Sequence, residues 1–127
     1  MGSSYAQNRL GDIYFEGTLV EKDNDKAISY FLDTIHNENA SQRNKVYAME
    51  TLGDIFLEKN DPQAITWYEK VASYDSYAQL QLGEIYLNGT FGKKDIQKAR
   101  QYFKDVIEKE DSSRNKARAE KLLKSIE

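Results

Sequence analysis

Three stretches of this 127-residue chain repeat one pattern of small and large apolar residues. In each stretch an Ala is followed four residues later by Leu, five later by Gly and eight later by an aromatic residue. The three sets are Ala6-Leu10-Gly11-Tyr14, Ala48-Leu52-Gly53-Phe56 and Ala78-Leu82-Gly83-Tyr86. Residues at i, i+4 and i+8 lie along one side of an α-helix, so the pattern predicts the same buried helix face three times. A Gly inside a helix costs about 1 kcal/mol relative to Ala, and its recurrence indicates close packing against another helix.

Each stretch is followed by a second helical pattern, in which an Ala precedes aromatic residues by three and four positions. The three sets are Ala27-Tyr30-Phe31, Ala64-Trp67-Tyr68 and Ala99-Tyr102-Phe103. This spacing again predicts one apolar helix face. Small Ala and Gly side chains let two helices approach closely, and the large rings fill the space beside them. The sequence therefore predicts three helical hairpins.

Capping residues and helix breakers place the ends of the helices. Asp61 followed by Pro62 is typical of a helix start. Asp95, and either Asp23 or Asn24, can cap the other two second helices, and Asp111 or Ser112 can cap a last helix. Glycines at 17, 89 and 92 interrupt the connections after the first and fifth helices. We expect helices at 4–16, 24–36, 41–58, 62–73, 76–88, 95–109 and 112–125.

The last of these helices repeats the pattern only in part. Its apolar stripe, with Ala119 and Leu122, lies among many Lys and Arg residues, as expected of a terminal repeat with a polar outer face. The predicted fold is all-α: a right-handed α/α superhelical solenoid of three helix-turn-helix repeats with a C-terminal capping helix. We expect one domain over 5–125, with repeats at about 5–36, 41–73 and 76–109 and the capping helix at 112–125. Residues 1–4 resemble an expression-vector remnant.

The composition argues against several classes of chemistry. The chain has no Cys, which excludes disulfides and thiolate metal sites and suits a reducing compartment such as the cytoplasm; a secreted effector or a piece of a lumenal protein stays open. The single His36 cannot form a typical zinc site, and neither the Gly92-Lys93-Lys94 segment nor Asp23-Asn24-Asp25 completes a phosphate or calcium loop. We therefore predict a protein that is not an enzyme and uses no metal or cofactor.

Charge is distributed unevenly along the chain. Residues 1–92 contain 7 Lys and Arg against 14 Asp and Glu, whereas residues 93–127 contain 11 against 7. A basic end on an acidic body could steer partners, support end-to-end self-association, or be merely a solvated face. Nucleic-acid binding through the basic end is a less favoured alternative, because the sequence pI is about 5.3 and the aromatic residues follow a core pattern.

The repeated pattern resembles that of the Sel1-like repeat family, which is related to the tetratricopeptide repeats. The first and third units follow its order of Ala, Leu-Gly, Tyr, a glycine-containing loop, Asp, Lys-Ala and an aromatic residue. The second unit has a shorter connection at 58–62, closer to an ordinary tetratricopeptide repeat. This resemblance implies an adaptor or scaffold that binds other proteins, and it implies no substrate or reaction.

In the resembling folds, partners commonly bind a concave surface lined by the first helices. If the Ala-Leu-aromatic stripe is buried, the neighbouring helix face should carry a row of tyrosines, a row of carboxylates and a row of apolar residues. We predict that this face binds a peptide or helix with apolar anchors and Lys or Arg. The candidate residues are Tyr5, Asn8, Asp12, Phe15, Tyr47, Glu50, Asp54, Leu57, Tyr77, Leu80, Glu84 and Leu87.

Two alternatives to this groove stay open. The tyrosines could instead close the hairpin interfaces, with the carboxylates merely solvated. The chain could also be a fragment of a larger repeat protein, or a regulatory domain of an enzyme, whose first helix exposes an interface that normally continues.

Overall fold

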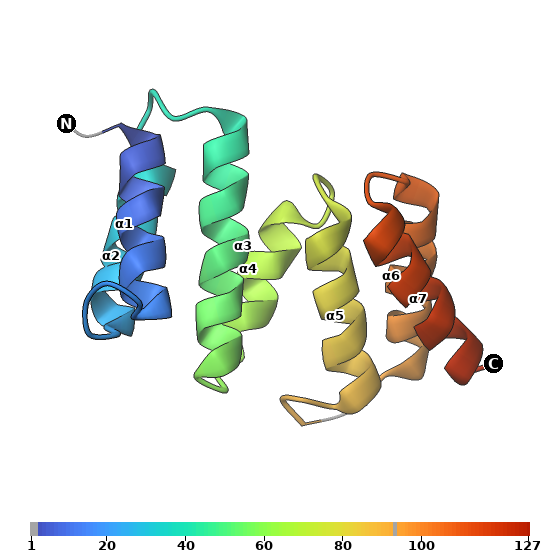
Figure 1. Cartoon of the computed structure of the whole chain (residues 1–127). Helices are drawn as coiled ribbons and strands as arrows, with labels where there is room; N and C mark the ends of the chain where they lie inside the picture. The colour runs from blue at the N-terminus through green and yellow to red at the C-terminus, as the bar shows by residue number, and fades with distance from the viewer. Residues whose placement is uncertain (1–2, 93) are drawn as a thin grey trace.

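Seven α-helices make up the fold in the computed structural model, which describes residues 3–92 and 94–127 and has no β-strand in that part (Figure 1). The helices are α1 (Ser4–Glu16), α2 (Asn24–His36), α3 (Gln42–Glu58), α4 (Gln63–Val71), α5 (Ser76–Asn88), α6 (Ile96–Lys109) and α7 (Ser113–Ser125). The predicted ends agree within one residue except for α4, which ends two residues earlier. The predicted all-α solenoid is confirmed.

Side-chain caps fix most of the helix starts. Asp23 and Ser112, each one of two predicted candidates, accept hydrogen bonds from the Lys26 and Asn115 backbone N–H groups. Asp95 caps α6 in the same way. In α4 the helix begins one residue later than predicted, and the Asp61 carboxylate accepts from the Gln63 N–H at 2.9 Å. Each cap satisfies one of the backbone donors that a helix start leaves unpaired.

Each hairpin is closed by an aromatic ring that lies against the glycine of its first helix. A Cβ atom added at Gly53 would stand 2.5 Å from the ring of Tyr68, and one added at Gly83 would stand 2.5 Å from the ring of Phe103. The matching distance at Gly11, to Phe31, is 2.7 Å. These distances are shorter than any carbon contact allows, so only glycine permits the two helices to come this close.

The Ala and Leu of the predicted buried face are covered in the second and third hairpins but not in the first. Ala48, Leu52, Ala78 and Leu82 are fully buried. In α1 the expectation was wrong: Ala6 is exposed and Leu10 is 39% exposed. The physical reason is that α3 and α5 are covered by the second helix of the preceding hairpin, whereas no described helix covers this side of α1.

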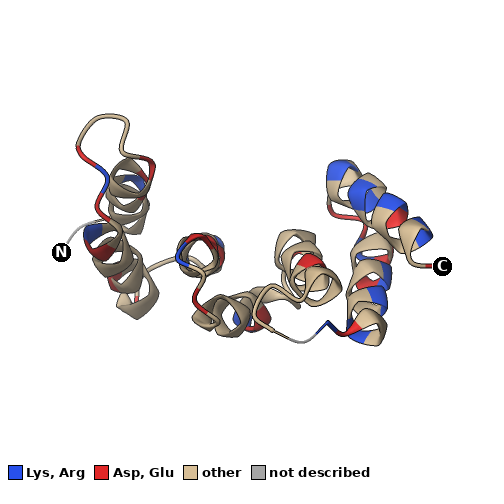
Figure 2. Cartoon of the chain, turned by 90° about the horizontal axis from the view of Figure 1, so that it is seen from below, with Lys and Arg blue, Asp and Glu red and all other residues tan. Residues whose placement is uncertain are grey.

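The hairpins stack side by side along a curved path, with α1 and α2 at one end and α6 and α7 at the other (Figure 2). The first helices α1, α3 and α5, followed by α7, form one layer, and α2, α4 and α6 lie behind them (Figure 1). Lys and Arg gather on α6 and α7 at the C-terminal end (Figure 2). This arrangement places the predicted binding residues along the layer of first helices.

We expect Gly53→Ala to lower the free energy of unfolding by about 1–3 kcal/mol, because the added methyl overlaps the buried Tyr68 ring. Ala has the better helix propensity, worth about 1 kcal/mol, so propensity alone predicts the opposite sign. Urea unfolding followed by circular dichroism would measure the change. Ser29→Ala, at an exposed position of α2, is the control. A stabilised Gly53→Ala variant would contradict the packing assignment.

Candidate protein-interaction groove

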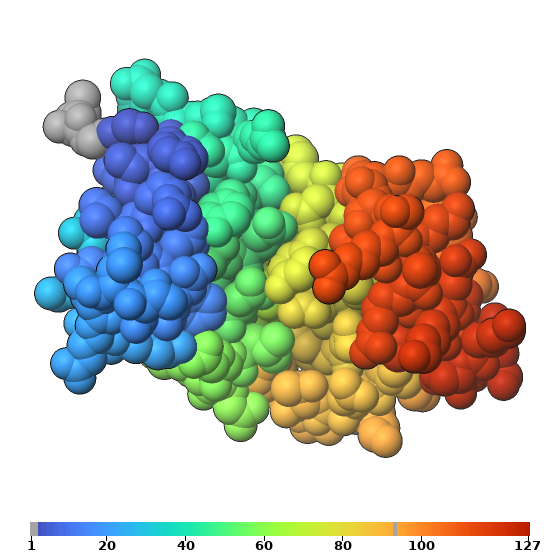
Figure 3. Space-filling model, viewed as in Figure 1, coloured from blue at the N-terminus to red at the C-terminus, as the bar shows by residue number. Residues whose placement is uncertain are grey.

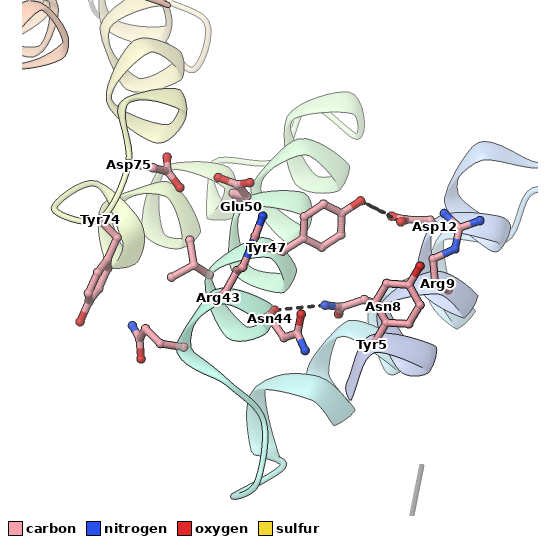
Figure 4. A pocket seen from close by; sticks show the side chains of 12 residues that line it. Tyr5, Asn8, Arg9, Asp12, Arg43, Asn44, Tyr47, Glu50, Tyr74 and Asp75 are labelled. Atoms are coloured by element: carbon pink, nitrogen blue, oxygen red, sulfur yellow. Dashed lines mark hydrogen bonds between the residues drawn. The ribbon is translucent and has the colours of Figure 1, made fainter. Parts of the chain in front are cut away.

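A hollow of about 610 Å³ opens on the layer of first helices, between α1, the first half of α3 and the α4–α5 connection (Figure 4). Figure 3 shows this layer from the front, with α1 and α3 side by side. The hollow is lined by Tyr5, Asn8, Arg9, Asp12, Gln42, Arg43, Asn44, Val46, Tyr47, Glu50, Tyr74 and Asp75. Tyrosines, carboxylates, amides and two arginines therefore share one concave surface.

A second hollow of about 250 Å³ continues from the first toward the C-terminal ends of α1 and α3. Both hollows are lined by Asp12, Tyr47 and Glu50. We call the two together the groove. The smaller hollow is completed by Phe15, Glu16, Thr51, Asp54 and Tyr77.

The predicted binding residues divide between the groove and the core. Eight of them line the groove: Tyr5, Asn8, Asp12, Phe15, Tyr47, Glu50, Asp54 and Tyr77. The other four, Leu57, Leu80, Glu84 and Leu87, are not among the lining residues of either hollow. Leu80 is only 7% exposed, and it packs with Ala119 of α7 in a second core cluster against which Leu87 also lies. Helix α7 packs on α5 and therefore covers the predicted binding residues of α5 that follow Tyr77.

The tyrosine and carboxylate rows bind to each other between successive hairpins. The Tyr47 hydroxyl donates to both Asp12 oxygens at 2.7 and 2.8 Å, and the Tyr77 hydroxyl donates to Asp54 at 2.8 Å. In both pairs the carboxylate directly follows the hairpin glycine and the tyrosine directly precedes the next hairpin's alanine. The side chains predicted as a free row are thus also contacts that hold the stack together.

In the third contact of this series the donor is an arginine in place of a tyrosine. Arg118, which precedes Ala119, donates to Glu84, which follows Gly83, at 3.1 Å. Helix α7 therefore occupies the place of the first helix of a fourth hairpin, and Lys124 stands where the other hairpins have glycine. We call these three contacts the inter-repeat ladder.

Burial shifts the pKa values of the tyrosines and aspartates in the first two contacts of the ladder. Burial raises the pKa of Asp54, and the hydrogen bonds from Tyr68 and Tyr77 act in the opposite direction. Burial also raises the pKa of Tyr77, and the adjacent Asp54 charge raises it further. The same two effects, burial and the neighbouring Asp12, raise the pKa of Tyr47. The hydroxyls therefore keep their protons and remain donors over the whole physiological pH range.

Glu50 is the most perturbed carboxyl of the groove. Burial raises its pKa to about 9, with further contributions from a hydrogen bond to Asp75 and from the charges of Asp75 and Asp54. Its Oε2 atom, and the Oδ1 atom of Asn8, are buried with no hydrogen-bond partner in the described part of the chain. Buried polar atoms without partners are uncommon in folded proteins. Their presence at the wall of a hollow marks this part of the groove as able to accept donors from a bound molecule.

Sequence reasoning missed the groove residues that lie outside the tyrosine and carboxylate rows. They are Arg9, Gln42, Arg43, Asn44, Val46, Tyr74 and Asp75 in the larger hollow and Glu16 and Thr51 in the smaller one. One signal was present for the start of α3: the motif Ser-x-Arg-Asn-Lys occurs at 41–45 and again at 112–116. In both copies the Asn amide donates to a serine of the preceding first helix, Asn44 to Ser4 at 2.8 Å and Asn115 to Ser76 at 3.0 Å.

Neither a metal site nor a membrane span is found in the described residues. No group of three or more His, Cys, Asp or Glu side chains in residues 3–92 and 94–127 is placed to hold a metal ion. None of the helices in this part combines the length and the apolar character needed to cross a membrane.

The curved stack of hairpins and its polar groove define a helical repeat protein. The Sel1 repeat family matches residues 4–32, 48–73 and 76–104, and the chain belongs to this family. Sel1 repeats generally form non-catalytic scaffolds that bind other proteins. No curated protein matches the chain.

Two solved structures show the same architecture. A Sel1 repeat protein from Oxalobacter formigenes is 31% identical with a TM-score of 0.70, and the match covers 94% of this chain and 47% of that one. The protective antigen c5321 of uropathogenic Escherichia coli, which displays an SLR fold, is 26% identical with a TM-score of 0.70, and the match covers 98% of this chain and 26% of that one. This chain thus spans less than half the length of either protein.

We expect Tyr77→Phe to lower the free energy of unfolding by about 1–2 kcal/mol, because it removes a donor from the half-buried Asp54 carboxylate. Tyr5→Phe is the matched control. Tyr5 holds the equivalent position in the first hairpin, is 65% exposed, and should give a change within about 0.5 kcal/mol. Urea titration of both variants would measure the difference. Equal effects would show that the ladder does not stabilise the stack.

The raised pKa of Glu50 predicts a pH dependence of stability. Its pKa is about 9 in the folded chain, against 4.5 for an unperturbed glutamate, so unfolding releases a proton between these values. The free energy of unfolding should therefore fall as the pH rises through this window, by at most about 1.4 kcal/mol per pH unit for this group. Glu50→Gln should reduce the slope and be the more stable protein at pH 8. Asp12 and Asp54 are common to both proteins, so the comparison isolates Glu50. Parallel curves from pH 5 to 9 would contradict this assignment.

Proposed function

We propose that the groove binds a segment of a partner protein, and that the chain acts as a non-catalytic adaptor. The observation that carries this proposal is a hollow of about 610 Å³ lined by tyrosines and by buried or half-buried carboxyl groups on the layer of first helices. Tyr5 and Tyr74, at 65% and 55% exposed, offer rigid ring area to a ligand. Aromatic side chains of this kind dominate the binding energy of many protein interfaces.

The groove chemistry favours a segment with apolar anchors and at least one Lys or Arg. Glu50 and Asp75 lie next to each other at the α4–α5 end of the larger hollow (Figure 4). A cation placed between them would replace the proton that Glu50 holds and would give its unpartnered Oε2 atom a donor. Val46 and the rings of Tyr47 and Tyr74 supply the apolar contact surface.

Arg9 and Arg43 add positive charge to the same hollow. They can pair with an acidic residue of the bound segment, so the partner segment should carry both signs of charge. Substitutions that reverse the charge of Asp12, Asp54 and Glu84 would also break the ladder contacts. Their effect on binding would therefore not report on the groove alone.

A sharper test combines Tyr5→Ala with Tyr74→Ala, which removes groove area without touching the ladder. The probe is a displayed library of random 16-residue peptides selected on the native chain. The selected peptides should contain Lys or Arg with apolar residues, and the double variant should bind them at least about tenfold more weakly, since anchor residues contribute 2 kcal/mol or more. Ile96→Ala, at an exposed apolar residue of α6, is the control and should leave binding unchanged.

A charge variant tests the cation site separately. Glu50→Gln with Asp75→Asn keeps both side-chain shapes, and Asn is as good an N-cap for α5 as Asp. The affinity for the basic peptides should fall, and its dependence on salt should weaken. Selected peptides without basic residues, or peptides that bind the native and variant chains equally, would exclude the groove as the binding site.

A further inference from the structure

Helix α7 carries a row of positive charge along one side. The helix contains five Lys and Arg residues against a single Glu. Arg114, Arg118 and Lys121 are separated by four and three residues, so they are neighbours on one helix face, and all three are exposed. Figure 2 shows Lys and Arg along the length of this helix. We call these three residues the cationic row.

The cationic row lies on the side of the first-helix layer that forms the groove. The motif Ser-x-Arg-Asn-Lys places α3 and α7 in the same register. Ala48 and Ala119 are both fully buried, and Asn44 and Asn115 both donate to a serine of the preceding first helix. In this register the counterparts of the row all line the larger hollow, and they are Arg43, Tyr47 and Glu50.

The start of α7 lies directly beside the groove. Ser76 follows Asp75, which lines the larger hollow. The Ser76 backbone N–H donates to the Asp111 carboxylate at 3.0 Å, and the Ser76 hydroxyl donates to the same carboxylate. The Asn115 amide donates to the Ser76 hydroxyl oxygen at 3.0 Å. The cationic row therefore begins next to the α4–α5 end of the groove, where Glu50 and Asp75 lie together.

Most of the charge of the row is available to a ligand. Within residues 3–92 and 94–127, neither Arg114 nor Lys121 forms a salt bridge. Arg118 pairs with Glu84, yet 47% of its side chain remains exposed. A helix face that only has to be solvated can use charges of either sign, but this face uses positive charge alone. The row is therefore complementary to a negatively charged ligand.

We propose that the cationic row binds an acidic stretch of the same partner segment whose basic residue lies between Glu50 and Asp75, an inference that rests on the proposed function of the groove. One first helix, α5, stands between α3 and α7 (Figure 1). Packed helices are about 8–10 Å apart, and an extended chain advances about 3.3 Å per residue. The acidic stretch therefore begins about five or six residues from the basic residue.

An acidic peptide suits this surface better than a nucleic acid does. Glu84 and Asp75 lie beside the row and carry the same sign of charge as phosphate. A uniformly charged phosphate backbone would meet these carboxylates wherever it left the row. A peptide can place acidic residues on the row and basic or neutral residues on the groove.

The test adds an acidic tail to the peptides selected on the native chain. Each peptide is extended, at either end in turn, by a spacer of five Gly and Ser residues followed by four Glu or four Gln residues. At about 50 mM salt the Glu tail at one end should tighten binding about tenfold relative to the Gln tail, because several exposed charge pairs each contribute modestly. At about 500 mM salt the gain should shrink, since the charges are screened.

Paired variants locate the origin of this gain. Arg114→Gln with Lys121→Gln removes two charges of the row and leaves the ladder and the groove intact. The gain from the Glu tail should be lost, whereas the peptide without a tail should bind as tightly as before. Lys94→Gln with Lys104→Gln, at exposed positions before and within α6, removes the same charge elsewhere and should keep most of the gain. Unchanged urea midpoints would show that both variants are folded.

Four outcomes would overturn the proposal. Equal affinity for Glu and Gln tails, with untailed binding still dependent on Tyr5 and Tyr74, would exclude the row and leave the groove. An equal loss of the gain in both paired variants would reduce it to an effect of net charge. Untailed peptides that bind Tyr5→Ala with Tyr74→Ala as tightly as the native chain would exclude the groove, and the row with it. A 12-nucleotide single-stranded RNA that binds the native chain at about 50 mM salt, but not Arg114→Gln with Lys121→Gln, would assign the row to nucleic acid.

Discussion

The contact between an aromatic ring and a glycine within each hairpin determines the rest of the structure. Because the ring of Tyr68 lies where a Cβ of Gly53 would stand, the two helices are held at a separation that no other residue permits. The rotation of the first helix about its axis is fixed by the same contact. The residue after the glycine is turned by about 100° from it along the helix, and in all three hairpins that residue is a carboxylate that meets the next first helix.

This geometry couples stacking to the surface that is available for binding. Asp12 and Asp54 are fixed by tyrosine hydroxyls, so they shape the groove wall more than they attract a ligand. Among the groove residues that the structure describes, Glu50 and Asn8 each have a buried oxygen without a hydrogen-bond partner. The residues that hold the stack together and the groups left free for a ligand are therefore different parts of the same groove wall.

The fold could be predicted from sequence because its determinants are periodic. Ala, Leu, Gly and aromatic residues at fixed spacing identify the helices, their buried faces and their pairing, and the caps place their ends. The exposed stripe of α1 could not be recognised in this way, because Ala6 and Leu10 have the same spacing as their buried counterparts. Their exposure depends on whether another helix covers them, which is a property of the whole stack.

The groove was predicted less completely, for a physical reason. Tyr74 and Asp75 belong to the connection between α4 and α5, where no helical period indicates which way a side chain points. Leu80 fits the predicted row, yet α7 covers it, because the last helix docks as a first helix of a fourth unit. A prediction based on one helix face identifies the residues on that face, but it cannot tell which of them the neighbouring helices cover.

The two ends of the stack differ in the chemistry that they offer. At the C-terminal end, the last contact of the ladder joins Arg118 to Glu84. Lys124 stands at the position of α7 where the first helix of each hairpin has its glycine. At the N-terminal end, the ladder begins with a tyrosine that is 65% exposed beside uncovered Leu10. A further hairpin that packs on α1 therefore needs a carboxylate and an apolar helix. A further hairpin that packs on α7 would have to bury a lysine.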